Sequence, residues 1–370
     1  MLSIRQKFTV LAAVSLLASQ TFASPLTIEK QGSFAVGGTV KTSAGQYTPV
    51  PEAIKGKSSN PFWDVYQASI AAGGQTLHGD HASVFYQIPV NAKPYPLVFL
   101  HGYGQSARMW QTTPDGREGF DTIFLRKGYP IYLIDQPRRG QAGQSTVAAN
   151  LPAVPDDQFW YAQFRIGVYP NMNKGVAFPK DAASQDQFFR QMTPDTGAFD
   201  VGVITDSMVK LFDKVGQGVF VTHSAGGVIG WTTAMQSDKV KGIIAVEPGS
   251  FPFPEGEVPP TQTSQFGDVA PMTVSKAQFE RLTKLPIVIY FGDFIPDHLD
   301  GTQGGEQWYA RLQLAKQWAK VVNQHGGKVS VVELPKVGIH GNTHFLMSDT
   351  NNQQVAEHLA EWLKENGLDK

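Results

Sequence analysis

Short apolar runs alternate along this chain with longer segments of helical periodicity. Continuous runs rich in Val, Ile, Leu and Phe predict buried strands. They lie at residues 95–100, 130–135, 219–224, 240–246, 285–291 and 329–334. Apolar residues at helical spacing predict helices at 119–127, 199–215, 225–236, 307–324 and 353–366, and another helix is expected to begin near residue 106. Because strands and helices alternate, we expect βαβ units and a mainly parallel twisted sheet flanked by helices.

The first part of the chain has a different pattern. Residues 26–40 and 83–90 alternate apolar and polar side chains between Gly and Pro, which is typical of antiparallel strands with one exposed face. A connection that contains Pro and Gly joins the two segments. We therefore expect antiparallel pairing near the start of the chain and nowhere else.

Two segments have no regular period. Residues 146–196 are rich in aromatic and turn-forming residues and predict a cap insertion, and residues 248–283 predict a second loop insertion above the sheet. The cap aromatics either line a pocket for the acyl or alcohol part of a substrate or form the cap's own small core, and the core is the commoner role for any single aromatic. The predicted organisation is one domain over residues 24–370 that carries both insertions.

The N-terminal residues predict a segment that is removed from the mature protein. Residues 1–23 combine a basic start at Arg5 and Lys7, an apolar run over residues 8–18, and small residues at the end. This run is too short for a bilayer span, which needs about 20 residues, so the segment is typical of a secretory signal peptide. We expect a bacterial periplasmic or secreted protein with no membrane span after signal cleavage.

Composition narrows the chemistry further. The chain has 370 residues, of which 41% are hydrophobic and 17% charged, a composition that provides ample material for a core. The formal net charge is −1 and the 31 basic residues are scattered, which argues against nucleic-acid binding. The chain has no cysteine, so disulfides, a thiolate nucleophile and a cysteine-ligated zinc are excluded. We expect neither a cofactor nor a metal.

The most informative stretch surrounds Ser224, where an apolar run changes into small residues and then a helical pattern. It is typical of the nucleophile elbow, G-x-S-x-G, in which a strained turn exposes a serine above the sheet. Thr222 stands where the motif has its first glycine. A buried strand, a glycine-rich connection and a helix also occur in proteins without serine chemistry, so the motif needs support from the rest of the chain.

Candidate partners for Ser224 follow later strands, at the edge where parallel sheets bind ligands. A serine nucleophile needs a histidine base, which in turn needs an acid, and the chain order serine, acid, histidine is that of α/β-hydrolases. His344 is preferred over His340 as the base. The acid is Glu247, or Asp297 with the neighbouring Asp293 as a weaker candidate, and the residues alone do not decide between them.

Four segments together resemble the α/β-hydrolase superfamily, and within it a group of secreted bacterial esterases. They are HGYGQSARMW at 101–110, HSAGG at 223–227, VEPG at 246–249 and GNTHFLMSDTNN at 341–352. The resemblance implies the α/β-hydrolase fold and a glutamate as the third catalytic residue. The last of the four segments is the most specific.

The same resemblance assigns roles residue by residue. It implies that Glu247 is the acid, that His344 is the base, and that the backbone N–H groups of Tyr103 and Ala225 form the oxyanion hole. The group has cysteines directly after its His-Gly pair, where this chain has Tyr103 and Gly104. Any property that depends on those cysteines is therefore not expected here.

These residues predict a serine hydrolase that cleaves small-molecule carboxylic esters through an acyl-enzyme. An amide or peptide hydrolase with the same triad is the nearest alternative, and a non-catalytic binding protein on the same fold is another. Dehalogenase chemistry is disfavoured because it needs an aspartate where Ser224 stands. The oligomeric state stays open, a homodimer included.

Overall fold

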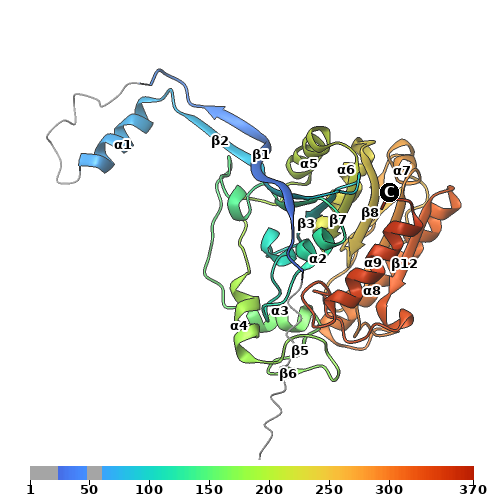
Figure 1. Cartoon of the computed structure of the whole chain (residues 1–370). Helices are drawn as coiled ribbons and strands as arrows, with labels where there is room; N and C mark the ends of the chain where they lie inside the picture. The colour runs from blue at the N-terminus through green and yellow to red at the C-terminus, as the bar shows by residue number, and fades with distance from the viewer. Residues whose placement is uncertain (1–23, 48–60) are drawn as a thin grey trace, which may run out of the picture.

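An eight-stranded mixed sheet forms the centre of the computed structural model, which describes residues 24–47 and 61–370 (Figure 1). The predicted signal peptide lies outside these residues. The strand order is β1-β2-β4-β3-β7-β8-β11-β12. The strands are β1 (Ile28–Thr42), β2 (Thr76–Pro89), β3 (Leu97–Leu100), β4 (Ile131–Asp135), β7 (Gly218–His223), β8 (Val240–Val246), β11 (Pro286–Phe291) and β12 (Lys328–Glu333).

Strand pairing follows the predicted pattern in this sheet. Every neighbouring pair from β4 to β12 is parallel, whereas β2 pairs antiparallel with both β1 and β4. All residues of β3 and β7 are buried, because helices cover both faces of the parallel part, and this explains their continuous apolar runs. The predicted mainly parallel sheet flanked by helices is confirmed.

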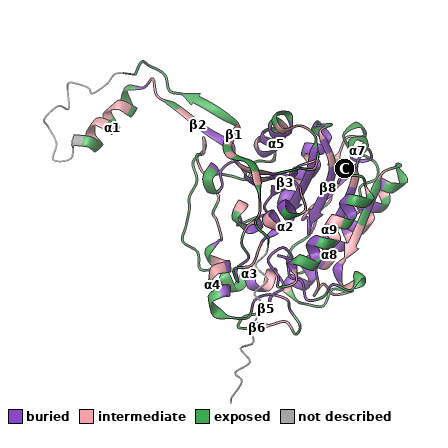
Figure 2. Ribbon diagram, in the orientation of Figure 1, coloured by how far each residue is buried: buried purple, intermediate pink, exposed green. Residues whose placement is uncertain are grey.

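Helices cover the two faces of the sheet and form two hydrophobic cores. One core includes side chains from α5, α6, α7 and α8, and the other includes side chains from α2, α9 and the cap segment. Figure 2 shows the buried strands enclosed between these layers. No helix in the described part of the chain is long and apolar enough to cross a membrane. The α-helices are α1 (Pro61–Ala72), α2 (Phe120–Arg126), α3 (Asp157–Gln163), α4 (Ala182–Arg190), α5 (Val201–Val215), α6 (Gly226–Gln236), α7 (Lys276–Leu282), α8 (Gln303–Gln324) and α9 (Asn352–Glu365).

The hairpin of β1 and β2 extends beyond the body of the molecule and carries α1 near its outer end (Figure 1). Strand β2 begins at Thr76, well before the predicted start at residue 83, and α1 lies in what was expected to be an irregular connection. The outer part of β1 is exposed on both faces. Residues 76–82 of β2 include Gly79 and Asp80, residue types that are depleted in strands, so the alternation of apolar and polar residues on which the prediction depended begins only after them.

The predicted insertions contain short elements. Residues 146–196 include α3, α4 and the two small strands β5 (Gly167–Val168) and β6 (Asn171–Met172). β5 and β6 pair antiparallel, so the expectation of antiparallel pairing only near the start is wrong for this segment. Residues 248–283 include β9 (Pro252–Pro254), β10 (Met272–Val274) and α7. The division into one domain with a cap stays a prediction.

A buried ion pair ties the base of the hairpin to the loop after β4. Asp80 and Arg138 are 2% and 5% exposed, and Nε and Nη2 of Arg138 lie 2.8 and 3.1 Å from the two oxygens of Asp80. Thr146 donates to the same carboxylate from its amide, at 3.0 Å, and from its hydroxyl. The hydrogen bonds from Arg138 hold the pKa of Asp80 far below its ordinary value, so the contribution of this pair to stability is present at neutral pH.

We expect Asp80→Asn to lower the free energy of unfolding by about 3–5 kcal/mol, because it leaves the Arg138 charge buried without a counter-ion. Asparagine tolerates the φ of 56° at this position. Urea unfolding followed by circular dichroism measures the change. Asp213→Asn is the matched control, since the pair of Asp213 and Lys239 has 58% and 35% of its side chains exposed and should cost at most about 1 kcal/mol. Equal losses in the two variants would contradict the expectation.

Candidate active site

Ser224 lies in a tight turn between β7 and α6. Its φ is 51°, a left-handed value that is uncommon for a residue with a side chain. The Ser224 amide donates to the Val246 carbonyl at 2.9 Å, and the Gly227 amide donates to the Ser224 carbonyl at 2.9 Å. A Cβ atom at Gly227 would lie 2.6 Å from Cβ of Pro248. Gly227 therefore leaves the space in which the segment after β8 crosses the start of α6.

The departure from the G-x-S-x-G motif has a structural explanation. Thr222 occupies the position of the first glycine and is fully buried. Its Cγ2 atom would lie 3.1 Å from a Cβ atom at Gly230, one turn into α6. Gly230 in α6 therefore leaves the space that Thr222 needs, whereas in the motif the residue at position 222 is itself a glycine and needs none.

Glu247 is in direct contact with His344, which lines the same pocket as Ser224. Glu247 follows β8 directly and is fully buried, and His344 is 1% exposed. Nδ1 of His344 lies 2.5 Å from Oε2 of Glu247. Because a carboxylate accepts, Nδ1 carries the proton, and Nε2 of the neutral ring is left as an acceptor.

Arg165, from the cap segment, supplies the counter-charge of Glu247. Its Nη1 donates to Oε2 of Glu247 at 3.0 Å and its Nη2 donates to Oε1, which also accepts from the Gly292 amide at 2.7 Å. Burial raises the pKa of Glu247, but the Arg165 charge and the hydrogen bond from His344 outweigh burial and lower the pKa to about 2. The carboxylate is therefore ionised at neutral pH.

Sequence reasoning missed Arg165. It stands at the end of the aromatic run FWYAQF, and a basic residue in such an apolar stretch was the available signal. Arg165 is 3% exposed and has a φ of 61°. Its Nε donates to the Asp293 carbonyl at 2.8 Å, so one side chain connects the cap, the end of β11 and the buried carboxylate.

Three neighbours fix the position of His344. Its amide donates to the Phe164 carbonyl at 3.0 Å, and its ring stacks on the Phe164 ring with centroids 5.4 Å apart. Its carbonyl accepts from Nε2 of His223 at 3.0 Å, and the Trp308 ring lies 4.2 Å from its own ring. Burial lowers the pKa of His344, with Glu247 acting in the opposite direction. The resting ring is therefore neutral.

Asp349 explains why the segment 341–352 has such a distinctive sequence. Its carboxyl group is fully buried and accepts from the Thr343 amide at 2.7 Å, the Thr343 hydroxyl at 2.9 Å and Nδ2 of Asn342 at 3.2 Å. Burial raises the pKa of Asp349 to about 7, against these hydrogen bonds. This network holds the turn immediately before His344.

The alternative candidates from the sequence lie elsewhere. The Asp297 side chain is 96% exposed and pairs with His298, not with His344. Asp293 accepts from the Gly341 amide at 2.8 Å, and its other oxygen accepts from the Phe294 amide at 2.7 Å. His340 is 68% exposed, with Nδ1 3.8 Å from Asp293. Asp293 therefore supports the histidine loop, and Asp297 has no contact with it.

The loop after β3 lies against the serine. A Cβ atom at Gly102 would be 2.7 Å from Cβ of Ser224. Nη1 of Arg139 donates to the carbonyls of Gly102 and Gln105 at 3.1 and 2.8 Å and fixes this loop from below. In the described part of the chain, the amides of Tyr103 and Ala225 donate to no other group. Both are thus free to bind an anionic oxygen.

A pocket of about 320 Å³ opens above Ser224. Three cap aromatics line it, whereas other cap aromatics, such as Tyr161 and Phe188, belong to the core. Ser224 and His344 both face this pocket, but in the described structure they form no hydrogen bond with each other. In enzymes without bound substrate, the hydrogen bond between nucleophile and base is often long and shortens only when substrate binds. The lining consists of Tyr103, Phe159, Trp160, Gln163, Phe164, Ser224, Ala225, Gly249, Phe266, Gln307, Trp308, Arg311 and His344.

Among the described residues, no cluster of three His, Asp or Glu side chains has the geometry to hold a metal ion.

Comparison with known proteins identifies the class. The alpha/beta hydrolase family matches residues 97–368, so this chain belongs to the alpha/beta hydrolase family. A solved structure described as a novel bacterial esterase is 31% identical, covers 94% of this chain and 99% of its own, and superposes with a TM-score of 0.72. A probable secreted lipase, phiG, of a fungal species (strain ATCC 74256) is 27% identical over 75% of this chain and 84% of its own. Fold and relatives together support a hydrolase of ester substrates.

We expect Glu247→Gln to lower kcat for a chromogenic short-acyl ester by about 10³- to 10⁴-fold, the loss typical of a triad acid converted to its amide. Asp297→Asn is the matched control and should stay within about twofold of the unchanged protein, because a fully exposed carboxylate contributes little. Circular dichroism verifies that Glu247→Gln, which unpairs Arg165, is still folded. A large loss of kcat in Asp297→Asn, with little loss in Glu247→Gln, would instead assign the role of the catalytic acid to Asp297.

Proposed function

We propose that this protein is a serine carboxylesterase that cleaves small-molecule esters through an acyl-enzyme. The observation that carries the proposal is the contact of 2.5 Å between His344 and an ionised, buried Glu247 at the pocket that also contains Ser224. A neutral histidine with Nδ1 fixed by a carboxylate offers Nε2 as a base. The left-handed backbone of Ser224 supports its role as the exposed nucleophile.

In the proposed reaction, Nε2 of His344 takes the proton of the Ser224 hydroxyl while Oγ bonds to the carbonyl carbon of the ester. The amides of Tyr103 and Ala225 bind the oxyanion that forms. His344 then gives its proton to the leaving alcohol, and an acyl-enzyme remains. Water, deprotonated by His344, attacks the acyl carbon. The bond to Oγ of Ser224 then breaks, His344 returns the proton to Oγ, and the acid is released. Glu247 stabilises the positive imidazole in both steps.

The location of the protein is part of the proposal. The signal-peptide pattern of residues 1–23 predicts export. The fungal relative is named as a secreted lipase, which is compatible with export of this chain. We propose a bacterial periplasmic or secreted enzyme whose cap, residues 146–196, supplies aromatic walls for the substrate.

We expect Ser224→Ala to lower kcat for a chromogenic short-acyl ester by about 10⁴-fold or more, because the remaining groups have no nucleophile to activate. The variant should also fail to react with a fluorophosphonate probe. Ser330→Ala, at an exposed position of β12, is the control and should behave like the unchanged protein in both assays. Labelling of the unchanged protein at another serine would contradict the proposal, and failure to label at all would favour a binding protein.

The pH dependence tests the base. Because burial lowers the pKa of His344, the neutral ring persists below the ordinary histidine pKa of 6.5. We expect kcat/KM for a neutral ester to be constant around pH 7 and to fall on the acid side with a midpoint below 6.5. Initial rates between pH 4 and 8 measure the midpoint. A midpoint at or above 6.5 would contradict the proposed environment of His344.

A further inference from the structure

Arg311 is the one arginine among the described residues that line the pocket above Ser224. It lies on α8, with its guanidinium carbon 5.1 Å from the Trp308 ring. Its Nη1 donates to the carbonyl of Gln307 at 2.9 Å and to Oε1 of the same residue at 2.5 Å. Nε and Nη2 of Arg311 have no hydrogen-bond partner in the described part of the structure. Two N–H donors of the planar guanidinium group of Arg311 are therefore unused in the pocket.

These free donors lie close to the nucleophile. A Cβ atom at Gly249 would lie 3.7 Å from Nε of Arg311, and the Gly249 amide donates to the Ser224 carbonyl at 3.3 Å. The glycine leaves the space between the guanidinium and the Ser224 turn open. A group bound by Arg311 would therefore be part of the molecule whose ester bond reaches Ser224.

The charge of Arg311 has no local counter-ion. No Asp or Glu belongs to the described lining of the pocket. Glu247 attracts Arg311 through space, but Arg165, the Gly292 amide and His344 already occupy its two oxygens. Burial lowers the pKa of Arg311 to about 10, so the side chain is still charged at neutral pH.

This charge also bears on catalysis. Arg311, with Arg165, lowers the pKa of His344 in addition to the effect of burial, which means that it opposes the positive imidazole formed in the proposed reaction. A neutral ester leaves this repulsion in place. An anion bound to Arg311 would offset it and would also satisfy the two free donors.

We propose that Arg311 binds a carboxylate on the substrate, so that the preferred esters carry a negative charge beside the ester bond. The inference rests on the proposed esterase function and names its substrate class. A planar fork with two free donors matches a carboxylate in geometry and charge. The pocket of about 320 Å³ fits a small acidic ester.

The test compares esters that differ only by a carboxylate or an amide at the same position. Monomethyl succinate and methyl succinamate place the charge on the acyl side, and 4-acetoxybenzoate and 4-acetoxybenzamide place it on the alcohol side. Hydrolysis at pH 7 is followed by pH-stat titration. We expect the unchanged protein to prefer the anionic member of at least one pair by about 10- to 100-fold in kcat/KM, the effect of one charge-assisted hydrogen-bond pair.

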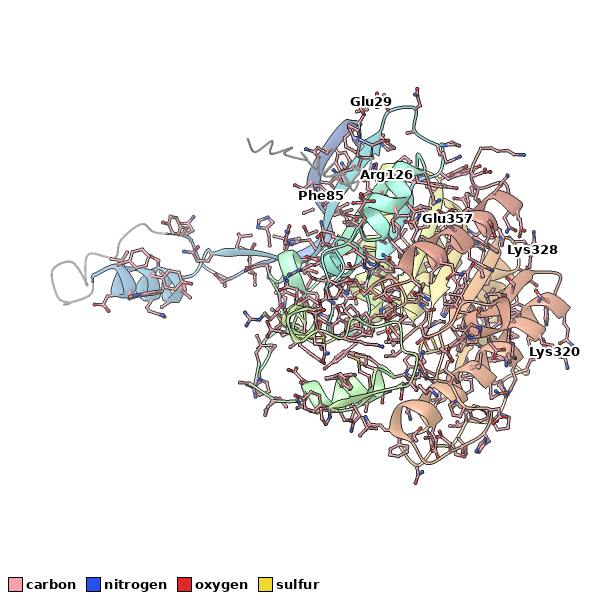
Figure 3. All side chains as sticks on the ribbon, turned by 60° about the horizontal axis from the view of Figure 1, so that its bottom comes forward. Glu29, Phe85, Arg126, Lys320, Lys328 and Glu357 are labelled. Atoms are coloured by element: carbon pink, nitrogen blue, oxygen red, sulfur yellow. The ribbon has the colours of Figure 1, made fainter. Side chains whose placement is uncertain are left out.

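The preference should disappear in Arg311→Gln and be only partly restored in Arg311→Lys, which keeps the charge but not the planar fork. Because Arg311→Gln removes a charge that opposes the positive His344, kcat/KM for the neutral members should rise rather than fall in this variant. Lys320→Gln is the matched control. Lys320 is an exposed residue of α8 at the periphery of the molecule (Figure 3), and its loss should leave the preference unchanged. Thermal unfolding verifies that each variant is folded.

Two outcomes would overturn the inference while the proposed function stands. One is equal turnover of the anionic and neutral members of both pairs by the unchanged protein, a result that needs no variant. The other is an equal loss for both members in Arg311→Gln, which would assign Arg311 a purely structural role against Trp308. Turnover of none of the four esters, together with no fluorophosphonate labelling, would instead overturn the proposed function itself.

Discussion

The buried carboxylate of Glu247 is the feature on which the rest of the site depends. A charge with no exposure to solvent is very costly unless it is paired and hydrogen-bonded. Here Arg165, the Gly292 amide and Nδ1 of His344 provide four donor contacts to its two oxygens. Each donor comes from a different part of the chain, so the carboxylate also fixes the cap, the end of β11 and the histidine loop relative to one another.

The two arginines near this carboxylate have different electrostatic roles. Arg165 neutralises Glu247 and keeps it ionised, so that a positive His344 is stabilised in the proposed reaction. The charges of both arginines oppose the positive His344, but only Arg311 faces the pocket with donors that nothing in the described structure uses. The local balance of one carboxylate and two guanidinium groups therefore leaves one positive charge, which is the physical basis for the preference for acidic esters that we propose.

Backbone packing around Ser224 depends on glycines in the His-Gly loop, in the HSAGG segment and in α6. Gly102 allows the loop after β3 to contact the serine, and Gly227 allows the strand end at Pro248 to cross the start of α6. Gly230 accepts the bulk of Thr222. The match to the elbow motif is therefore imperfect because the glycine that the motif has in the strand, at position 222, is replaced by Thr222, and Gly230 in the helix leaves room for it.

The sequence by itself determined the α/β architecture, since the continuous apolar runs are those of strands buried on both faces. It also selected Ser224, His344 and Glu247 as candidates, because their order and motifs are those of the hydrolase resemblance. It missed α1 and the first part of β2, residues 76–82, where Gly79 and Asp80 are not typical of a strand. Only the tertiary structure showed that Glu247, and not Asp297, contacts His344, and only it revealed Arg165 and Arg311 near this contact. Arg165 and Glu247 pair although more than 80 positions separate them in the chain, and Arg311 lacks a counter-ion because of what packs around it. Both features depend on packing in space, which no local sequence pattern encodes.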